Sequence, residues 1–432
     1  MSVETGFWGI GVLLLLLVLR VPVALALIAV SFGGIASLIG VRPALGVLSN
    51  TPYSFTASWT MSAVPMFLLM GFVAFHAQLT AGLFDAAKAL LRKLPGALGI
   101  ASIFACSAFA TVCGSSLATA ASMGRIAIPE MIRAGYAPSI AAGCIAAGGT
   151  IGALIPPSIL MILYGIFAET SITSVFLGGF SIGILTALGY SAIVLTLAWT
   201  RPDLVPRRPI EEERLSAREA VGRVWPVLLL IALVFGGLFS GYFTATEAGA
   251  IGAAGALFCA ALVGRMNRHV LRQSLLETLM TTASLLIIGI GAAMFTRFLG
   301  ITGLSGFISQ QVGAAEIGYY QLMLIIVIVY LLLGMVMEPF GAMLITLPVF
   351  IPLLNAEGIS LVWFGVLVVK LLEIGMITPP VGLNVFVIRN VASEHVTTLQ
   401  IFRGVAPFFL ADLVVTATII VFPALVLFLP GL

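Results

Sequence analysis

Two double prolines stand inside apolar stretches of the chain and mark where its chemistry is to be expected. Pro156 and Pro157 lie in GTIGALIPPSI, and Pro379 and Pro380 lie in IGMITPPVGL. Proline lacks a backbone donor and its ring clashes with the preceding helical turn, so neither stretch can form an unbroken helix. In lipid, the freed carbonyls and amides are tolerated only where they meet a partner or a wet cavity. Each double proline is therefore a candidate binding site.

The two double prolines occupy corresponding places in two halves of the chain. Ile151 and Ile374 each open the pattern I-G-x-x-x-P-P, and the two patterns lie 223 positions apart. The same displacement carries Pro129 onto Pro352. Because several matches keep one displacement, we interpret them as an internal repeat and not as chance. Two interrupted apolar segments at corresponding positions of two halves indicate the binding site of a secondary transporter.

Two further breaks lie upstream of the double prolines and are typical of hairpin tips. One contains Ser115 and Ser116, and the other contains Glu338. The half-helix that begins at each of the four breaks presents unpaired amides and a partial positive charge, which attract an anion. We expect three of these half-helices to begin with proline, which suits a first turn, and the fourth to begin with the two capping serines.

The half-helices that end at the same breaks expose carbonyl oxygens, which suit a sodium ion. The expected ends are Cys113, Thr150, Met337 and Met376. Hydroxyl groups that can complete the ion's shell belong to Ser115, Ser116, Thr150 and Thr378. The residues that we expect to face the substrate are Ser116, Pro156, Pro157, Pro379 and Pro380. The sequence thus predicts a carboxylate substrate with sodium as the driving ion.

Each candidate also has a structural interpretation. Ser115 and Ser116 can act only as helix caps, and Thr150 and Thr378 only as donors to backbone carbonyls. Glu338 is a functional hypothesis by default, because an ionisable group in lipid is costly. It could ligate a cation, carry a proton or bond neighbouring amides, and the sequence does not separate these roles. Structural pairing or an interfacial position is expected for four other charged residues: Glu247, Arg297, Lys370 and Glu373.

The composition places the chain in a lipid bilayer. Hydrophobic residues make up 61% and charged residues 9% of the 432 residues, with a mean hydropathy of +1.19. This leaves too little polar surface for a soluble globule, and the long apolar segments do not alternate as barrel strands do. The net charge of +3 is small and gathers in a few loops, which argues for membrane topology and against a nucleic-acid partner.

Other chemistry has no support in the sequence. The chain has no GxxxxGK[ST] loop, no HExxH and no GxSxG with plausible partners, so neither ATP hydrolysis nor any other enzyme activity is expected. Its three histidines are too scattered for a transition-metal site, and we expect its four cysteines to be buried thiols. No cofactor is expected beyond the coupling sodium ions.

The predicted fold is an all-α integral membrane protein with about ten spans, two re-entrant hairpins and two broken helices in an inverted repeat. Apolar segments are expected at 7–19, 22–40 and 53–78. Scaffold spans are expected in 1–79 and 225–298, with a connector at 201–224. The first repeat, 80–200, contains an interfacial arm, hairpin 1 at about 98–133, a broken helix at 138–168 and a span at 171–200. The second repeat, 299–432, contains an interfacial arm, hairpin 2 at about 319–354, a broken helix at 358–388 and a last span at 401–430.

Helix length and loop charge predict the topology. Each limb of the first hairpin is near 15 residues, which at ~1.5 Å per residue reaches about two-thirds of a ~30 Å hydrocarbon core. Six arginines in residues 201–223 place the connector in the cytoplasm. Counting crossings from that loop puts both termini on the periplasmic side. The two hairpins then enter from opposite faces, so the repeats are inverted.

Four blocks of the sequence resemble the large membrane subunit of tripartite ATP-independent periplasmic (TRAP) transporters. They are CGSSLATAASMGRIAIPEM, GTIGALIPPSILMILYG, MEPFGAMLITLPVFIPLL and GMITPPVGLNVF, in this order. The resemblance runs nearly from end to end. It implies an elevator-type fold of the ion transporter superfamily, driven by a sodium gradient, in a bacterial inner membrane. It also implies two partners, a small four-helix membrane subunit and a periplasmic substrate-binding protein, and a substrate such as a C4-dicarboxylate, sialic acid or another sugar or keto acid.

The same resemblance implies an ion site built from the two hairpin tips and the two broken helices. Its members here are Gly114, Ser115, Ser116, Gly149, Thr150, Glu338, Gly341 and Thr378, the last beside Pro379. Many relatives have Asp where Glu338 stands, and some have an acid where this chain has Leu117 to Thr119. The number of sodium ions and any proton carried by Glu338 therefore stay open.

We expect the chain to be the transport subunit of a sodium-coupled symporter for an organic anion, moving a hairpin-bearing domain against a scaffold. Two alternatives remain. A stand-alone sodium- or proton-coupled anion transporter of the same superfamily would need no binding protein. A membrane scaffold or enzyme that uses the broken helices as a cavity would show no ligand-dependent flux, and the lack of catalytic motifs disfavours it.

Overall fold

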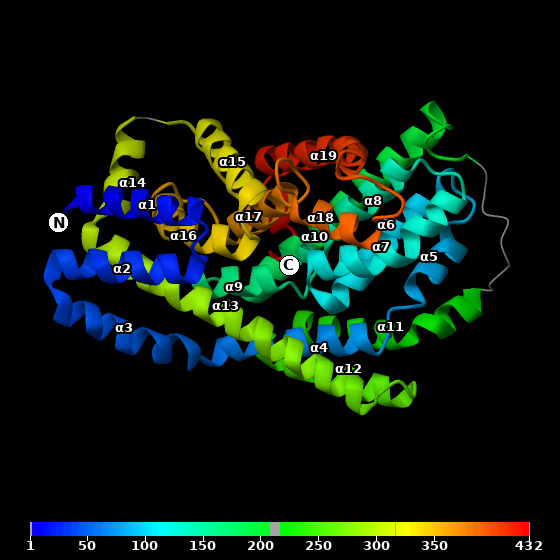
Figure 1. Ribbon diagram of the computed structural model, residues 1–432, viewed down its shortest axis with the longest axis horizontal. Helices are drawn as coiled ribbons and strands as arrows, with labels where there is room; N and C mark the ends of the chain where they lie inside the picture. The colour runs from blue at the N-terminus through cyan, green and yellow to red at the C-terminus, as the bar shows by residue number, and fades with distance from the viewer. Residues whose placement is uncertain (1, 208–216, 316, 432) are drawn as a thin grey trace.

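The chain is helical throughout the residues that the computed structural model describes, which are 2–207, 217–315 and 317–431 (Figure 1). In lipid, backbone N–H and C=O groups must be satisfied within the protein, and a helix does so within one segment. Eight helices of this part of the chain are long and apolar enough to cross a membrane. The all-α membrane class is thereby confirmed, while the total of about ten spans stays a prediction.

The first half of the chain opens with four helices. We call these four, together with the first three helices of the second half, the framework helices. It continues with a short arm helix, a hairpin, a broken helix and a long helix. The elements are α1 (Val3–Val18), α2 (Val23–Ile39), α3 (Val41–Thr56), the 3-10 turn η1 (Trp59–Ser62), α4 (Ala63–His76), α5 (Leu83–Leu91), α6 (Ala97–Cys113), α7 (Ser116–Arg133), α8 (Pro138–Thr150), the 3-10 turn η2 (Ile151–Ala153), α9 (Ile159–Phe167) and α10 (Ile172–Thr200).

The second half begins with framework helices α11 to α13 and then repeats the order of arm, hairpin, broken helix and long helix. Its elements are α11 (Ala217–Phe239), α12 (Ala245–Leu262), α13 (Arg268–Thr302), α14 (Leu304–Ala314), α15 (Tyr319–Val336), α16 (Pro339–Ala356), α17 (Leu361–Gly375), α18 (Leu383–Val391), α19 (Thr398–Val421) and α20 (Ala424–Leu427). The order from α5 to α10 matches that from α14 to α19, as the internal repeat predicts. The connector at 201–224 falls partly outside the described residues.

Two of the four half-helices end at the predicted residue, and α15 and α17 end one residue before the predicted Met337 and Met376. The half-helices do not all begin where the sequence predicts. Helix α6 ends at Cys113 and α8 at Thr150. The expectation that three half-helices begin with proline is wrong for two of them. Helix α9 begins at Ile159, capped by Ser158, and α18 begins at Leu383, after Gly382. A residue before proline is disfavoured in the helical region, so a double proline stays in the loop and a later residue starts the helix. Only α16 begins with its proline, Pro339.

The hairpin limbs are longer than predicted. Helix α6 has 17 residues and α7 has 18. At ~1.5 Å per residue each is about 26 Å long, close to the thickness of the hydrocarbon core. The expected limb of about 15 residues is wrong because the turn takes only Gly114 and Ser115, and α7 starts directly at Ser116.

Two predicted segment limits are also wrong. Residues 53–78 are not one segment, because α3 ends at Thr56 and the extended Ser58 separates it from η1 and α4. The sequence did not reveal α3 as a helix because polar residues such as Asn50 interrupt its apolar pattern. The last crossing, expected at 401–430, ends at Val421, since Pro423 cannot continue a helix and instead precedes the short α20.

Most of the framework helices gather on one side of the molecule, away from most of the hairpin and broken helices, while α1 lies beside α14. Figure 1 shows α2, α3, α4, α11 and α12 along the lower side, with α15 to α19 above them. Helix α13, the longest at 35 residues, crosses obliquely between the two groups. It contacts α2 and α4 of the framework and α16 of the second hairpin. The framework therefore meets the second hairpin along α13, and it meets the first hairpin where α4 and α11 contact α6.

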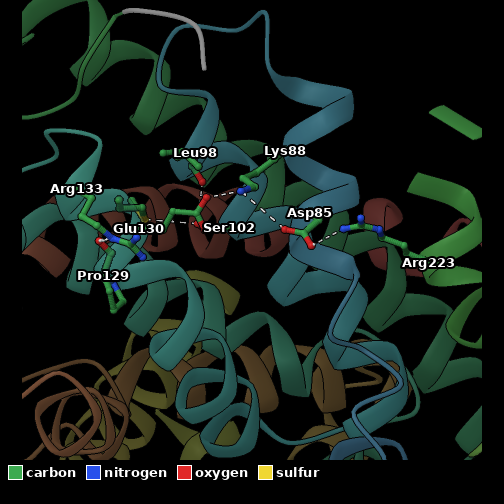
Figure 2. Close-up of polar contacts among 9 residues, drawn as sticks. Asp85, Lys88, Leu98, Ser102, Pro129, Glu130, Arg133 and Arg223 are labelled. Atoms are coloured by element: carbon green, nitrogen blue, oxygen red, sulfur yellow. Dashed lines mark hydrogen bonds and ion pairs between the residues drawn. The ribbon is translucent and has the colours of Figure 1, made fainter. Parts of the chain in front are cut away.

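An ion-pair chain anchors the arm helix α5 (Figure 2). Asp85 on α5 accepts from Arg223 of framework helix α11 at 3.3 Å and lies 3.8 Å from Lys88 Nζ, one turn along α5. Lys88 also pairs with Glu130 on α7. The chain thus connects a framework helix, the arm and the first hairpin at the ends that carry most of their charge.

The two repeats meet through small residues, and the second repeat contains a buried ion pair. A Cβ atom on Gly143 of α8 would lie 2.2 Å from the carbonyl carbon of Gly404 on α19, so the two backbones are in direct contact. Further along α19, Asp412 forms an ion pair with Lys370 of α17, and both side chains are fully buried.

Further hydrogen bonds extend this pair into a polar chain between the repeats. Lys370 Nζ donates to Thr186 Oγ1 at 3.1 Å, and the Tyr190 hydroxyl donates to the Asp412 carboxylate at 2.7 Å. The same hydroxyl lies 3.2 Å from Thr150 Oγ1 at the end of α8. Buried charges are stable only when they are paired and hydrogen-bonded. The structural pairing predicted for Lys370 is confirmed.

Replacing Lys370 by Met should lower the free energy of unfolding by about 3–5 kcal/mol, because Asp412 is left as an unpaired buried charge. Thermal unfolding of the purified protein in detergent measures the change. The double variant Lys370→Met with Asp412→Leu should recover most of the loss, since both charges are then gone. A single variant as stable as the native chain would show that the pair does not hold α17 to α19.

Candidate functional site

A cavity of about 450 Å³ lies where the hairpin tips meet the framework. Hairpin 1 contributes its tip, hairpin 2 contributes Glu338 and Pro339, and the first broken helix contributes Ala153 and Ile159. Helix α17 closes another side with its last turn, and framework helices α4 and α13 form the opposite wall. Both hairpin tips and both broken helices therefore border this space, although α8, α15 and α18 contribute no residue to its lining.

Three helices have their first residue in the lining of the cavity, so their amino-terminal ends lie at it. These are α7 at Ser116, α9 at Ile159 and α16 at Pro339. The described residues that line the cavity include no Lys or Arg, but they include three glutamates. Attraction for an anion must therefore come from the helix ends, each equivalent to roughly half a positive charge. The carboxylates provide the complementary attraction for cations.

The tip of hairpin 1 rests on the backbone of the first broken helix. Gly114 has φ = 60°, and a Cβ atom there would lie 2.3 Å from the Pro157 carbonyl oxygen. A Cβ atom on Gly149 would lie 3.1 Å from the Ser116 carbonyl oxygen. Glycine is required where φ is positive and where two backbones touch. The fold thus brings together the candidate residues of the first half, including Gly114, Ser115, Ser116 and Gly149.

Two hydroxyls of the candidate sodium site have backbone partners. Thr150 Oγ1 donates to the Ala147 carbonyl at 2.6 Å, and Thr378 Oγ1 donates to the Ile374 carbonyl at 2.6 Å. These bonds match the structural interpretation given above, and each oxygen still has a lone pair that can accept or coordinate. Their contact with an ion stays a prediction.

The candidates of the second half are not gathered as closely. Of these, Gly341 faces Val23 of α2, where a Cβ atom would be 3.2 Å from a methyl group. Neither Gly341 nor Thr378 lines the cavity, and the same holds for four prolines predicted to face the substrate: Pro156, Pro157, Pro379 and Pro380. Pro156 and Pro157 are buried beneath the hairpin tip, and Pro379 and Pro380 are exposed. Their roles stay predictions.

Glu338 stands at the tip of hairpin 2 and faces the cavity. It occupies the position before the first turn of α16, yet its carboxylate makes no capping hydrogen bond. Of the three roles left open by the sequence, bonding to neighbouring amides is not what this structure shows. Cation binding and proton transfer remain.

Glu373 is the residue of the cavity that the sequence interpretation missed. It lies in the last turn of α17, is only 1% exposed and lines the cavity. Its Oε1 accepts from Ser116 Oγ at 3.0 Å, and its Oε2 has no hydrogen-bond partner. Of the two expected surroundings, structural pairing or an interfacial position, the interfacial position is wrong; the carboxylate is bonded to Ser116, and Lys370 one turn earlier is paired with Asp412. A sequence signal existed, since an ionisable residue within one helical turn of the ITPP break is a functional hypothesis by default.

The remaining charged candidates have structural surroundings. Glu247 forms a capping box with Thr244 at the start of α12, accepting from the Thr244 amide at 2.8 Å. Arg297 is exposed on α13. Asn384 was not singled out, although it is fully buried at the start of α18 and donates to the Ala146 carbonyl at 3.3 Å. Its Oδ1 has no hydrogen-bond partner.

Interrupted membrane helices whose ends converge on a cavity lined by carboxylates define a membrane transporter. The family model described as "Tripartite ATP-independent periplasmic transporter, DctM component" matches residues 10–425. The chain belongs to this family of large TRAP transporter permeases.

Individual relatives agree with the family. The C4-dicarboxylate TRAP transporter large permease protein DctM of Pseudomonas aeruginosa is 35% identical over 375 residues, 86% of each chain. The sialic acid TRAP transporter large permease protein SiaM of Vibrio cholerae is 32% identical over 407 residues, 92% of this chain and 94% of the relative. Among solved structures, the YdaH transporter of Alcanivorax borkumensis has a similar fold, with a TM-score of 0.63 at 18% identity over 88% of this chain and 89% of that one. The relatives are permeases and not enzymes.

Replacing Gly114 by Ala should destabilise the protein by about 1–3 kcal/mol, because the residue must keep a left-handed conformation against the Pro157 carbonyl. Thermal unfolding in detergent measures the loss. Gly46→Ala is the matched control, since this helical glycine has nothing within 4 Å of an added Cβ atom. Equal stability of the two variants would contradict the tight seat of the hairpin tip.

Proposed function

We propose that the chain is the transport subunit of a sodium-coupled importer of organic acids. The observation that carries the proposal is the convergence of three helix amino termini on a cavity lined by Glu277, Glu338 and Glu373. The helix ends attract the acid, and the carboxylates attract cations. A site of this kind binds an anion and a cation more tightly together than either alone, and such mutual stabilisation couples their movement.

The substrate is a small organic anion with at least one carboxylate. C4-dicarboxylates and sialic acid, which the printed names of the relatives give as their substrates, both carry this group. None of the described residues that line the cavity is basic, so selectivity for one acid over another has to arise from shape and from backbone groups. The apolar wall formed by Leu68, Phe72 and Phe75 of α4 suits the hydrocarbon part of such an acid.

Movement follows the elevator scheme, in which the hairpins and broken helices shift as a unit against the framework. The position of the cavity supports this, because residues of α4 and α13 face those of the two hairpins across it. The direct backbone contacts between the repeats support a rigid moving unit. The inverted orientation of the two hairpins gives the cavity access from each side in turn.

The family supports two partners, a small membrane subunit and a periplasmic binding protein that delivers the acid. We place the complex in a bacterial inner membrane, with both termini on the periplasmic side and the connector in the cytoplasm. The framework carries exposed apolar side chains to receive the small subunit, among them Leu45 and Tyr53 on α3. Delivery by a separate protein means that substrate choice is shared between the cavity and that protein.

Proteoliposomes containing the chain with its membrane and binding-protein partners should accumulate succinate or N-acetylneuraminate when an inward sodium gradient is imposed. Radiolabelled uptake over time measures this, and potassium in place of sodium is the control. Uptake that is unaffected by removing sodium contradicts the coupling. Uptake by the chain without a binding protein favours the stand-alone transporter.

Glu338→Gln should raise the sodium concentration needed for half-maximal uptake by at least about tenfold, since a charged ligand or counter-charge at the hairpin 2 tip is lost. Uptake measured over a range of sodium concentrations gives the value. Glu357→Gln is the matched control, because Glu357 lies exposed beyond the other end of α16. An unchanged sodium requirement in Glu338→Gln excludes this carboxylate from the ion site.

A further inference from the structure

A second cavity, of about 370 Å³, lies outside the site described above, which we now call the transport cavity. Its walls come from the end of α4, the segment that leads from α4 into the arm helix, and the middle of α7, with Phe109 from α6. The described residues that line it include one arginine, Arg125, and no Lys, Asp or Glu. The lining of the transport cavity has the opposite character, with three glutamates and no Lys or Arg. The second cavity therefore suits an anion and not a cation.

The two cavities follow one another along α4 and α7. Phe75 of α4 lines both of them, so they meet at its ring. On α7, Ala118 lines the transport cavity, whereas Ser122 and Arg125 line the second cavity. Residues three and four positions apart lie on the same face of a helix. One face of α7 therefore leads from the hairpin 1 tip to Arg125.

The second cavity lies at the end of the molecule where basic residues gather. Gln78 belongs to its lining, and the backbone carbonyl of Gln78 accepts from Arg265 at 2.7 Å. Asp85, on the arm helix that follows, is bonded to Arg223. We place this end in the cytoplasm by the positive-inside rule. For an importer, the second cavity is then on the side where the substrate is released.

The side chain of Arg125 is suited to a carboxylate. It is exposed, and among the residues that the structure describes its guanidinium has no hydrogen bond or ion pair. A guanidinium binds a carboxylate through two parallel N–H···O bonds. Ser122 and Thr80 of the same lining carry hydroxyls that can donate to the same group.

We propose that the second cavity is a release site for the transported acid, in which Arg125 binds the carboxylate after the acid has passed Phe75. This deepens the function proposed above and rests on the substrate being an anion. The glutamates of the transport cavity repel the acid and the guanidinium attracts it, so Arg125 favours its movement toward the cytoplasm. No covalent bond is formed or broken.

The transported acid fits this place better than an inorganic anion. The two cavities have similar volumes, about 450 and 370 Å³, so an acid that fits the first also fits the second. Phe109, Met123 and Ile126 give the second cavity apolar walls, which suit the hydrocarbon part of an organic acid. An inorganic anion has no such part.

Thiol labelling of the whole chain in lipid nanodiscs tests the site without a substrate. Ser122→Cys is introduced after the four native cysteines have been replaced by alanine. Its rate of modification by a sulfonate-bearing methanethiosulfonate is divided by the rate with an uncharged methanethiosulfonate of similar size. This ratio should fall at least about threefold in Arg125→Gln, since a positive charge near the thiol is lost. An unchanged ratio, or no modification of Ser122→Cys in the chain that keeps Arg125, overturns the proposal.

Two further variants control the labelling. Arg133→Gln should keep the ratio, because Arg133 is exposed further along α7 and does not line the cavity. Arg125→Lys should also keep it, since the charge is retained, and this separates a lost charge from a disturbed fold. A ratio that falls equally in Arg133→Gln overturns the proposal, because the attraction then belongs to the whole basic surface.

Uptake by the complete transporter with its native cysteines is the functional measurement, with succinate and N-acetylneuraminate as the two probes. The acid under test is also loaded inside the proteoliposomes, where it occupies the release site and slows sodium-driven uptake. In Arg125→Gln the internal concentration that halves uptake should rise about tenfold, because a charge-assisted pair is lost. The external concentration for half-maximal uptake and the sodium requirement should stay as in the native chain, and Arg133→Gln should match the native chain throughout.

The outcomes of the uptake measurement separate the two proposals. An internal concentration that is the same in Arg125→Gln and in the native chain overturns the release site. A shift of the external value by as much as the internal one also overturns it, since Arg125 would then not act on the release side. Failure of the native transporter to take up both acids contradicts the proposed function, and the labelling ratio then decides whether Arg125 forms an anion site.

Discussion

The structure depends on the cost of leaving backbone groups unpaired in a medium without water. An unbroken helix would remove that cost, but it would also leave nothing polar inside the bilayer to hold an ion or an acid. The chain breaks its helices at four places and gathers three of the freed amino termini around one cavity. The rest of the backbone at these breaks is covered by close packing. For example, the hairpin tip at Gly114 lies against the Pro157 carbonyl. The same few turns of chain therefore form the cavity and provide the close packing that stabilises the fold.

The charged residues inside the membrane follow the same logic. Lys370 and Asp412 neutralise each other inside the second repeat, away from the cavity lining, and they connect α17 to α19. Among the residues that the structure describes, Glu338 and Glu373 have no partner of opposite charge, and both line the cavity. A charge that a protein leaves unpaired in low dielectric is retained for a reason other than stability. The contrast between the paired and the unpaired residues therefore separates the structural groups from those that meet the cargo.

Much of this arrangement could be predicted from the sequence, because prolines, glycines and apolar runs act locally. The end of α8 at Thr150 and the repeated order of elements follow from such signals. The starts of α9 and α18 could not be placed from proline alone, since Ser158 and Gly382 decide them. The sequence did not predict α3, because its polar residues interrupt the apolar pattern expected of a membrane helix. The contact between Glu373 and Ser116 joins residues 257 positions apart, and no local pattern reports a pairing of that kind.

The length of α13 has a consequence for the surrounding lipid. At ~1.5 Å per residue its 35 residues extend about 52 Å, against a hydrocarbon layer of about 30 Å. Such a helix must lie steeply inclined or stretch the acyl chains around it, and Figure 1 shows its oblique course. Leu279 and Met280 of this helix are exposed. The inclination of the helix therefore affects the lipid in contact with these side chains. Bilayer thickness thereby becomes a variable that acts on the wall of the cavity itself.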